Sequence, residues 1–160
     1  MVIGIDASRA NLEHKTGVEF YSYFLIQKLK KLFTNDTECR VASEADIRCR
    51  IEKVILYSPE PLRGDLANLP AGWEWKKVST PFRIPFRGKR PFLWTQLGLS
   101  LEMLRCPPDV LFVPSHALPL IHPKNSVVTI HDLGFESFPV CYHRLARAYL
   151  RWAARLAVRQ

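Results

Sequence analysis

Residues 2–33 read VIGIDASRANLEHKTGVEFYSYFLIQKLKKLF, and this stretch indicates the fold class. It opens with the short apolar run VIGID, typical of a buried strand, and continues through a polar loop at 7–15. Thr16 followed three residues later by Glu19 has the spacing of a capping box at a helix start. Apolar residues then recur every three or four positions, which predicts a helix ending near Phe33. Its predicted apolar face consists of Val18, Tyr21, Leu25, Leu29 and Leu32.

The same alternation of strand and helix patterns continues along the chain. Apolar runs predict strands at 54–57, 109–113 and 127–130, and a half-exposed strand is predicted at 73–78. Helical patterns occupy 92–104 and 144–160, a short helix is expected at 43–50, and 81–91 is typical of a loop. Strands separated by helices indicate parallel βαβ units, and strands that are apolar throughout indicate a sheet covered on both faces. We therefore predict an α/β fold with a Rossmann-like, doubly wound parallel sheet of about five to six strands.

The bulk composition limits the class of protein. A length of 160 residues predicts one domain over 1–160, and 48% hydrophobic residues are too many for a disordered chain. The last helical pattern carries no terminating glycine, asparagine or proline, so we expect the domain to be truncated from a longer chain. Four cysteines without a CxxC pair predict free thiols in a reducing compartment. With no secretory leader and no bilayer-length apolar run, a cytoplasmic location is expected.

The net charge is +8, which is compatible with nucleic acid, anionic lipid or phosphorylated substrates as partners. Two basic features contribute to it. Residues 82–94, FRIPFRGKRPFLW, interleave cations with aromatic side chains, as membrane-interface and single-strand-binding segments do. The last helix carries a stripe of arginines without an acid on the same helix, which predicts either a solvated face or a surface for an anionic partner. These arginines are Arg144, Arg147, Arg151, Arg155 and Arg159.

Polar side chains follow three of the predicted strands. Asp6 ends the first, Ser115 and His116 follow 109–113, and His131 with Asp132 follow 127–130. Ligands of open parallel sheets bind beyond the carboxyl ends of the strands, so this edge is the candidate site. His131 is suited to donating to a sugar hydroxyl or a carbonyl; alternatively, it is a satisfied half-buried side chain and Asp132 caps the following loop.

Three further chemistries are weighed at the same edge. The helix start at Thr16 and Gly17 has free N–H groups and a partial positive charge that suit a phosphate, although an ordinary capped helix has the same sequence. Adjacent residues on an extended segment point in opposite directions, which disfavours a metal shared by His131 and Asp132. Ser115 lacks the G-x-S-x-G elbow of a hydrolase nucleophile.

Several segments together resemble the N-terminal domain of family 4 (group 1) glycosyltransferases of the GT-B fold. The segments are IGIDASR, TGVEFYSYFLIQKL, VILYSPEP, PFLWTQLGLSLEML, PDVLFVPSHALPL and VVTIHDLGFESFPVCY, in the order of that family. The resemblance implies a two-domain enzyme that transfers a sugar from a nucleotide-sugar to an acceptor with retention, without a metal and without a cofactor beyond the donor. Residues 1–160 would be its acceptor-side half, inactive without the nucleotide-sugar-binding half.

The resemblance also implies roles for particular residues. Gly17, with Thr16, would lie near the donor phosphates, and His131 would be the catalytic residue near the transferred sugar. The acceptor, a glycan or a lipid-linked sugar, would contact residues from the strand-end loops, namely Asp132, His116, Ser115 and Arg9. Peripheral contact with an anionic membrane at its inner face fits this implication, and no nucleic acid is expected. The alternative function is a non-catalytic basic Rossmann-like module that binds anionic membrane or nucleic acid.

Overall fold

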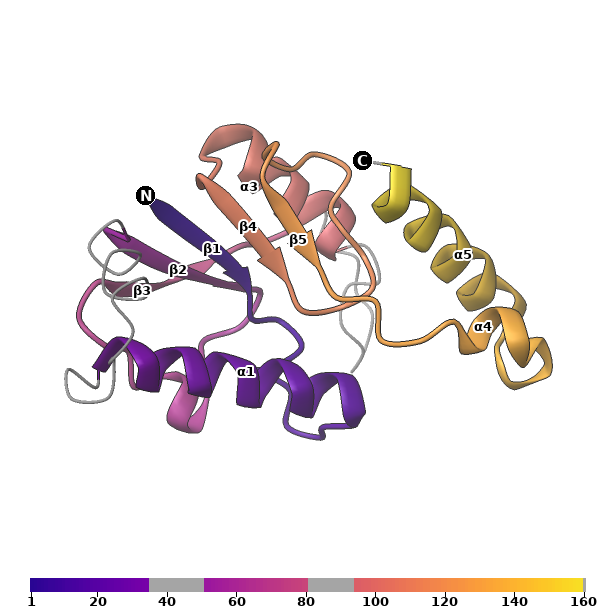
Figure 1. Ribbon diagram of the computed structural model, residues 1–160, viewed down its shortest axis with the longest axis horizontal. Helices are drawn as coiled ribbons and strands as arrows, with labels where there is room; N and C mark the ends of the chain where they lie inside the picture. The colour runs from indigo at the N-terminus through magenta and orange to yellow at the C-terminus, as the bar shows by residue number, and fades with distance from the viewer. Residues whose placement is uncertain (35–50, 81–93, 160) are drawn as a thin grey trace, which may run out of the picture.

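The computed structural model describes residues 1–34, 51–80 and 94–159, and its centre is one parallel β-sheet (Figure 1). The strand order is β3-β2-β1-β4-β5, so the chain crosses the sheet once on its way from β3 to β4. The strands are β1 (Val2–Asp6), β2 (Lys53–Ser58), β3 (Trp73–Lys77), β4 (Val110–Val113) and β5 (Ser126–Val128). All four strand pairs are parallel. The predicted Rossmann-like, doubly wound α/β fold is therefore confirmed.

Two apolar cores lie on opposite faces of the sheet. The side chains of Val54 and Leu56 on β2 belong to one core, and the intervening Ile55 packs against the other. The first core is closed by helix α1 (Gly17–Thr34) through Ile26. The second is closed by the π-helical turn η2 (Trp94–Leu99) and by α3 (Ser100–Arg105), with Met103 fully inside. This alternation explains why the strands are apolar along their whole length.

At position 4 of β1, the middle strand of the sheet, only a glycine fits. A Cβ atom on Gly4 would lie 2.7 Å from the ring of Tyr57 and 2.8 Å from Cγ of Pro108. β1 is paired on both sides, with Gly4 opposite Ile55 on β2 and Leu111 on β4. Close packing across the centre of the sheet therefore depends on the missing side chain.

Helix α1 begins and ends as predicted, but the predicted apolar face is only partly the buried one: Leu29 packs against the first core. Tyr21 and Leu32 are exposed, whereas Ser22, Ile26 and Lys30 are buried. Lys30 donates from Nζ to three backbone carbonyls that follow or belong to the 3-10 turn η1 (Gly64–Leu66): Asp65 and Leu66 at 2.8 Å and Asn68 at 3.0 Å. Polar side chains can line the buried face because each one finds a partner there.

The remaining differences are local. The predicted helix at 92–104 is a π-helical turn followed by α3, and the strand expected at 127–130 ends at Val128. The segment expected to be a loop after His131 contains α4 (Gly134–Ser137) and the 3-10 turn η3 (Pro139–Cys141), and α5 (Arg144–Arg159) follows. The expected helix at 43–50 and the loop at 81–91 lie outside the described residues, as does most of the basic segment 82–94.

Candidate functional site

The carboxyl ends of three neighbouring strands form one edge of the molecule. β1, β4 and β5 are adjacent in the sheet, so the residues that follow them lie side by side. Asp6 ends β1, Ser115 and His116 follow β4, and His131 follows β5. The sheet order therefore brings together the strand-end residues that were predicted to share an edge.

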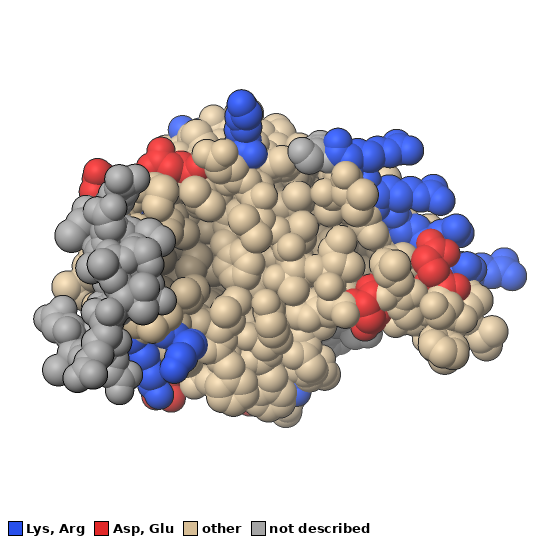
Figure 2. All heavy atoms as spheres, viewed as in Figure 1, with Lys and Arg blue, Asp and Glu red and all other residues tan. Residues whose placement is uncertain are grey.

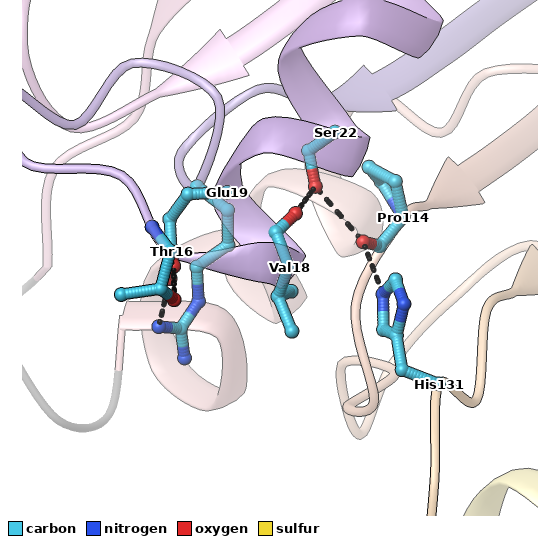
Figure 3. Close-up of polar contacts among 7 residues, drawn as sticks. Thr16, Val18, Glu19, Ser22, Pro114 and His131 are labelled. Carbon is cyan, nitrogen blue, oxygen red and sulfur yellow. Dashed lines mark hydrogen bonds and ion pairs between the residues drawn. The ribbon is translucent and has the colours of Figure 1, made fainter.

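The carbonyl of Pro114 joins this edge to helix α1 (Figure 3). Ser22, which is 0% exposed, donates from its hydroxyl to the Pro114 carbonyl at 3.0 Å and also to the Val18 carbonyl at 2.8 Å. Nε2 of His131 lies 3.3 Å from the same Pro114 carbonyl oxygen. The first turns of α1, where Gly17 lies, and the imidazole of His131 consequently sit on the same side of the molecule.

His116 and His131 form a pair of imidazoles. Their ring centroids are 5.1 Å apart with the planes at 74°, and the backbone N–H of His131 donates to Nδ1 of His116 at 3.4 Å. Burial lowers the pKa of His116, with His131 and Arg9 acting in the same direction and Asp132 opposing them. His116 is therefore neutral at pH 7. Because its Nδ1 accepts a hydrogen bond, the proton resides on Nε2, which can serve a ligand as a donor.

His131 is held on two sides by the protein. Since Nε2 faces a carbonyl oxygen, it carries a hydrogen and donates to that oxygen. The ring of Tyr21, on α1, meets the His131 ring edge-on at 4.8 Å. Asp132 is exposed, and its Oδ1 accepts the N–H of Gly134 at 2.8 Å. These contacts match the alternative given above, in which His131 is a satisfied, half-buried side chain and Asp132 caps the following loop. The exposed side of each residue is still available to a ligand.

The N-terminus of α1 is open but carries a buried acid. A Cβ on Gly17 would meet nothing within 4 Å, and among the described residues no acceptor is found for the N–H groups of Gly17 and Val18. Glu19, 6% exposed, accepts the backbone N–H of Thr16 at 3.1 Å and also the Thr16 hydroxyl. The capping box predicted from the sequence therefore forms in part, with the carboxylate folded back over the helix start.

Arg9 forms an ion pair with Glu19 and so compensates its negative charge. Its guanidinium Nη1 lies 3.2 Å from Oε1 of Glu19, and half of the arginine side chain is exposed. Burial opposes ionisation of Glu19, but the hydrogen bonds from Thr16 and the charge of Arg9 outweigh it, so the pKa of Glu19 lies below its ordinary value. Glu19 is thus charged at pH 7. A ligand at the start of α1 would meet two free amides and one guanidinium, with an acid beneath them.

Other chemistries considered from the sequence have less support. Ser115 is buried, and no histidine among the described residues accepts its hydroxyl. Within 1–34, 51–80 and 94–159 there is no group of three side chains that could hold a metal. Cys106 and Cys141 are exposed free thiols, while Cys39 and Cys49 lie outside the described residues.

Sequence reasoning missed two residues of this edge. Ser22 and Tyr21 contact Pro114 and His131, which lie far along the chain. Tyr21 was assigned to the apolar face of the helix, and no local signal marked Ser22. Only its spacing of four residues from Ile26, on the face that is buried, could have suggested a packed hydroxyl.

Comparisons with protein-family models, with curated proteins and with solved structures find no match for this chain. No helix among the described residues combines the length and apolarity needed to cross a membrane. The functional interpretation consequently rests on the site itself.

Proposed function

We propose that this chain is the N-terminal, acceptor-side domain of a retaining, metal-independent glycosyltransferase of the GT-B type, cytoplasmic and active only with a second, nucleotide-sugar-binding domain. The observation that supports it most is the junction at Pro114, where a strand-end carbonyl connects His131 to the first turns of α1. A donor phosphate and a transferred sugar need a helix start and a polar strand end within reach of one another. The reaction class comes from the resemblance of the sequence segments to family 4 glycosyltransferases.

Sugar transfer would require a different contribution from each part of the edge. The leaving nucleoside diphosphate gains negative charge in the transition state, and fixed donors stabilise that charge. Here the N–H groups of Gly17 and Val18 and the guanidinium of Arg9 would be the donors. Thr16 would lie beside the bound phosphates, next to Gly17 at the helix start. Because Glu19 offsets part of this positive potential, most of the cationic groups for the diphosphate must come from the second domain.

The two imidazoles would act on the sugars. His131 would hold the donor sugar beside the reacting carbon, with its ring fixed by Tyr21 and the Pro114 carbonyl. His116, neutral and protonated on Nε2, would donate to a hydroxyl of the glycan or lipid-linked acceptor, and Asp132 would accept from another. The proposal needs no cofactor besides the nucleotide-sugar.

Substitution of His131 tests the assignment. In a protein that joins this chain to its nucleotide-sugar-binding domain, His131→Ala should lower the turnover of sugar transfer by roughly a hundredfold, the usual order for a positioned catalytic side chain. His122→Ala, before β5 at the other end of the sheet, is the matched control and should change turnover less than twofold. Activity of His131→Ala within twofold of the unaltered protein would remove His131 from the mechanism. The anomeric configuration of the product, read by NMR, tests retention.

Nucleotide binding can be tested on the 160-residue chain. Titration with uridine and guanosine diphosphates should shift the amide NMR signals of Gly17 and Val18, since these N–H groups lack described acceptors. Adenosine monophosphate serves as the control ligand, because it lacks the second phosphate. If neither diphosphate moves these two signals at millimolar concentration, the helix start is not a diphosphate contact of this domain.

A further inference from the structure

The arginines of α5 project from the side of the helix that faces away from the sheet. Ala153 is fully buried and Ala157 packs against the second core, so this side of α5 faces inward. At 100° per residue, the five arginines at three- and four-residue spacing fall on the opposite side. Figure 2 shows their positive side chains extending from the edge of the molecule where α5 lies.

Little negative charge balances this row. Glu136 on α4 lies 2.5 Å from Arg151 and 4.0 Å from Arg147, so the acid missing from α5 itself is supplied by its neighbour. Among the described residues, no carboxylate pairs with Arg144, Arg155 or Arg159. The row therefore keeps a net positive charge of several units over about four helical turns.

A hollow and an apolar tip accompany the arginines. The hollow, about 480 Å³, runs along this side of the helix and is lined by Ala148, Arg151, Trp152, Arg155, Leu156 and Arg159. At the start of α5, where α4 and η3 meet it, three large apolar side chains are exposed. Val140 is 96% exposed, Leu145 73% and Phe138 67%.

We propose that this surface, the arginine row of α5 together with the apolar tip, binds an anionic lipid bilayer. Charge complementarity selects the partner, because phosphate headgroups match the arginines, and acyl chains accommodate the apolar tip. An aromatic such as Trp152 beside a row of cations is typical of side chains at the headgroup level. A nucleic acid would satisfy the arginines but would leave Phe138, Val140 and Leu145 in water. The inference is independent of the proposed enzyme activity.

The experiment is co-sedimentation of the 160-residue chain with vesicles. The chain should bind vesicles of equimolar phosphatidylcholine and phosphatidylglycerol, and should bind pure phosphatidylcholine at least tenfold more weakly. Each basic residue near an anionic surface contributes roughly a fivefold factor, so the double variant Arg155→Gln with Arg159→Gln should bind roughly 25-fold more weakly. Lys28→Gln with Lys124→Gln removes the same charge from α1 and from the loop before β5, and should bind within threefold of the unaltered chain.

The apolar tip is tested separately by Val140→Ser, which replaces a side chain that is too exposed to contribute to folding. It should weaken binding by about tenfold, and this loss should persist at high salt, whereas the contribution of the arginines is screened. Equal binding to both kinds of vesicle, or equal losses in the α5 variant and the lysine control, would overturn the proposal. Tighter binding to a single-stranded oligonucleotide than to the anionic vesicles would assign the surface to nucleic acid instead. Dimerisation without vesicles that the α5 variant abolishes would assign it to a second copy.

Discussion

Replacement of Gly4 by alanine tests the packing of the whole sheet. The new Cβ would lie 2.7 Å from the ring of Tyr57 and 2.8 Å from Pro108, whereas carbon atoms in contact prefer about 3.5–4.0 Å. Tyr57 is fully buried and the proline ring is rigid, so neither neighbour can withdraw. Overpacking of this kind costs about 3 kcal/mol, and the reduced entropy of the unfolded alanine chain returns roughly 0.7 kcal/mol. The expected net loss is about 2 kcal/mol.

Gly17→Ala is the matched control for this substitution. Its Cβ would meet nothing within 4 Å, and Gly17 does not have a positive φ. Only the entropic gain remains, so its free energy of unfolding should be unchanged or higher by up to about 1 kcal/mol. Urea denaturation followed by circular dichroism measures both variants, and for a chain of this length Gly4→Ala should also melt about 4–8 °C lower. If the two variants are equally stable to within about 0.5 kcal/mol, the close approach of β1 to Tyr57 and Pro108 is wrong.

Three further substitutions examine polar contacts made by helix α1. Lys30→Met should lower the free energy of unfolding by about 2 kcal/mol, because three carbonyls lose a charged donor, while Lys28→Met on the exposed side of the same helix should change it by less than about 0.5 kcal/mol. Ser22→Ala should cost about 1 kcal/mol and shift the imidazole NMR signals of His131, since their shared carbonyl loses its other donor; unchanged signals would contradict the Pro114 junction. Glu19 has a folded-state pKa below its unfolded value, so its stabilising contribution is present above about pH 4.5 and is lost as the pH falls through the folded pKa. Glu19→Gln should therefore be less stable than the unaltered chain at pH 7, and the difference should shrink as the pH is lowered below about 4.5. A difference in the free energy of unfolding that stays constant in urea titrations across this range would exclude the role.

Local patterns in the sequence predicted much of the fold. The span of α1 followed from apolar periodicity and from the capping pair Thr16 and Glu19, all within a few turns of one another. All five described strands were located by uninterrupted or alternating apolar residues, because the pattern within each strand depends on its own burial. Short elements were missed: α4 is only four residues long, which is too short for a repeating apolar pattern.

The candidate site was predictable only as an edge. The polar residues Asp6, His116 and His131 stand at or within a few residues of the ends of apolar runs, and the rule for parallel sheets places such ends together. Their contacts did not follow from the sequence. The tie between Ser22 and the Pro114 carbonyl spans 92 residues, and no periodicity within one helix reports a partner at that distance.

The amino-acid sequence alone thus determined the class of fold, the positions of the strands and of the two long helices, and the edge where polar residues gather, because periodicity, capping and turn residues act between near neighbours. Tertiary structure decided which face of α1 is buried, how the charge of Glu19 is compensated, and that Glu136 meets two of the α5 arginines. A polar side chain such as that of Lys30 can enter the core only if distant backbone groups satisfy it. That condition is set when the segments pack together, and it cannot be evaluated one segment at a time.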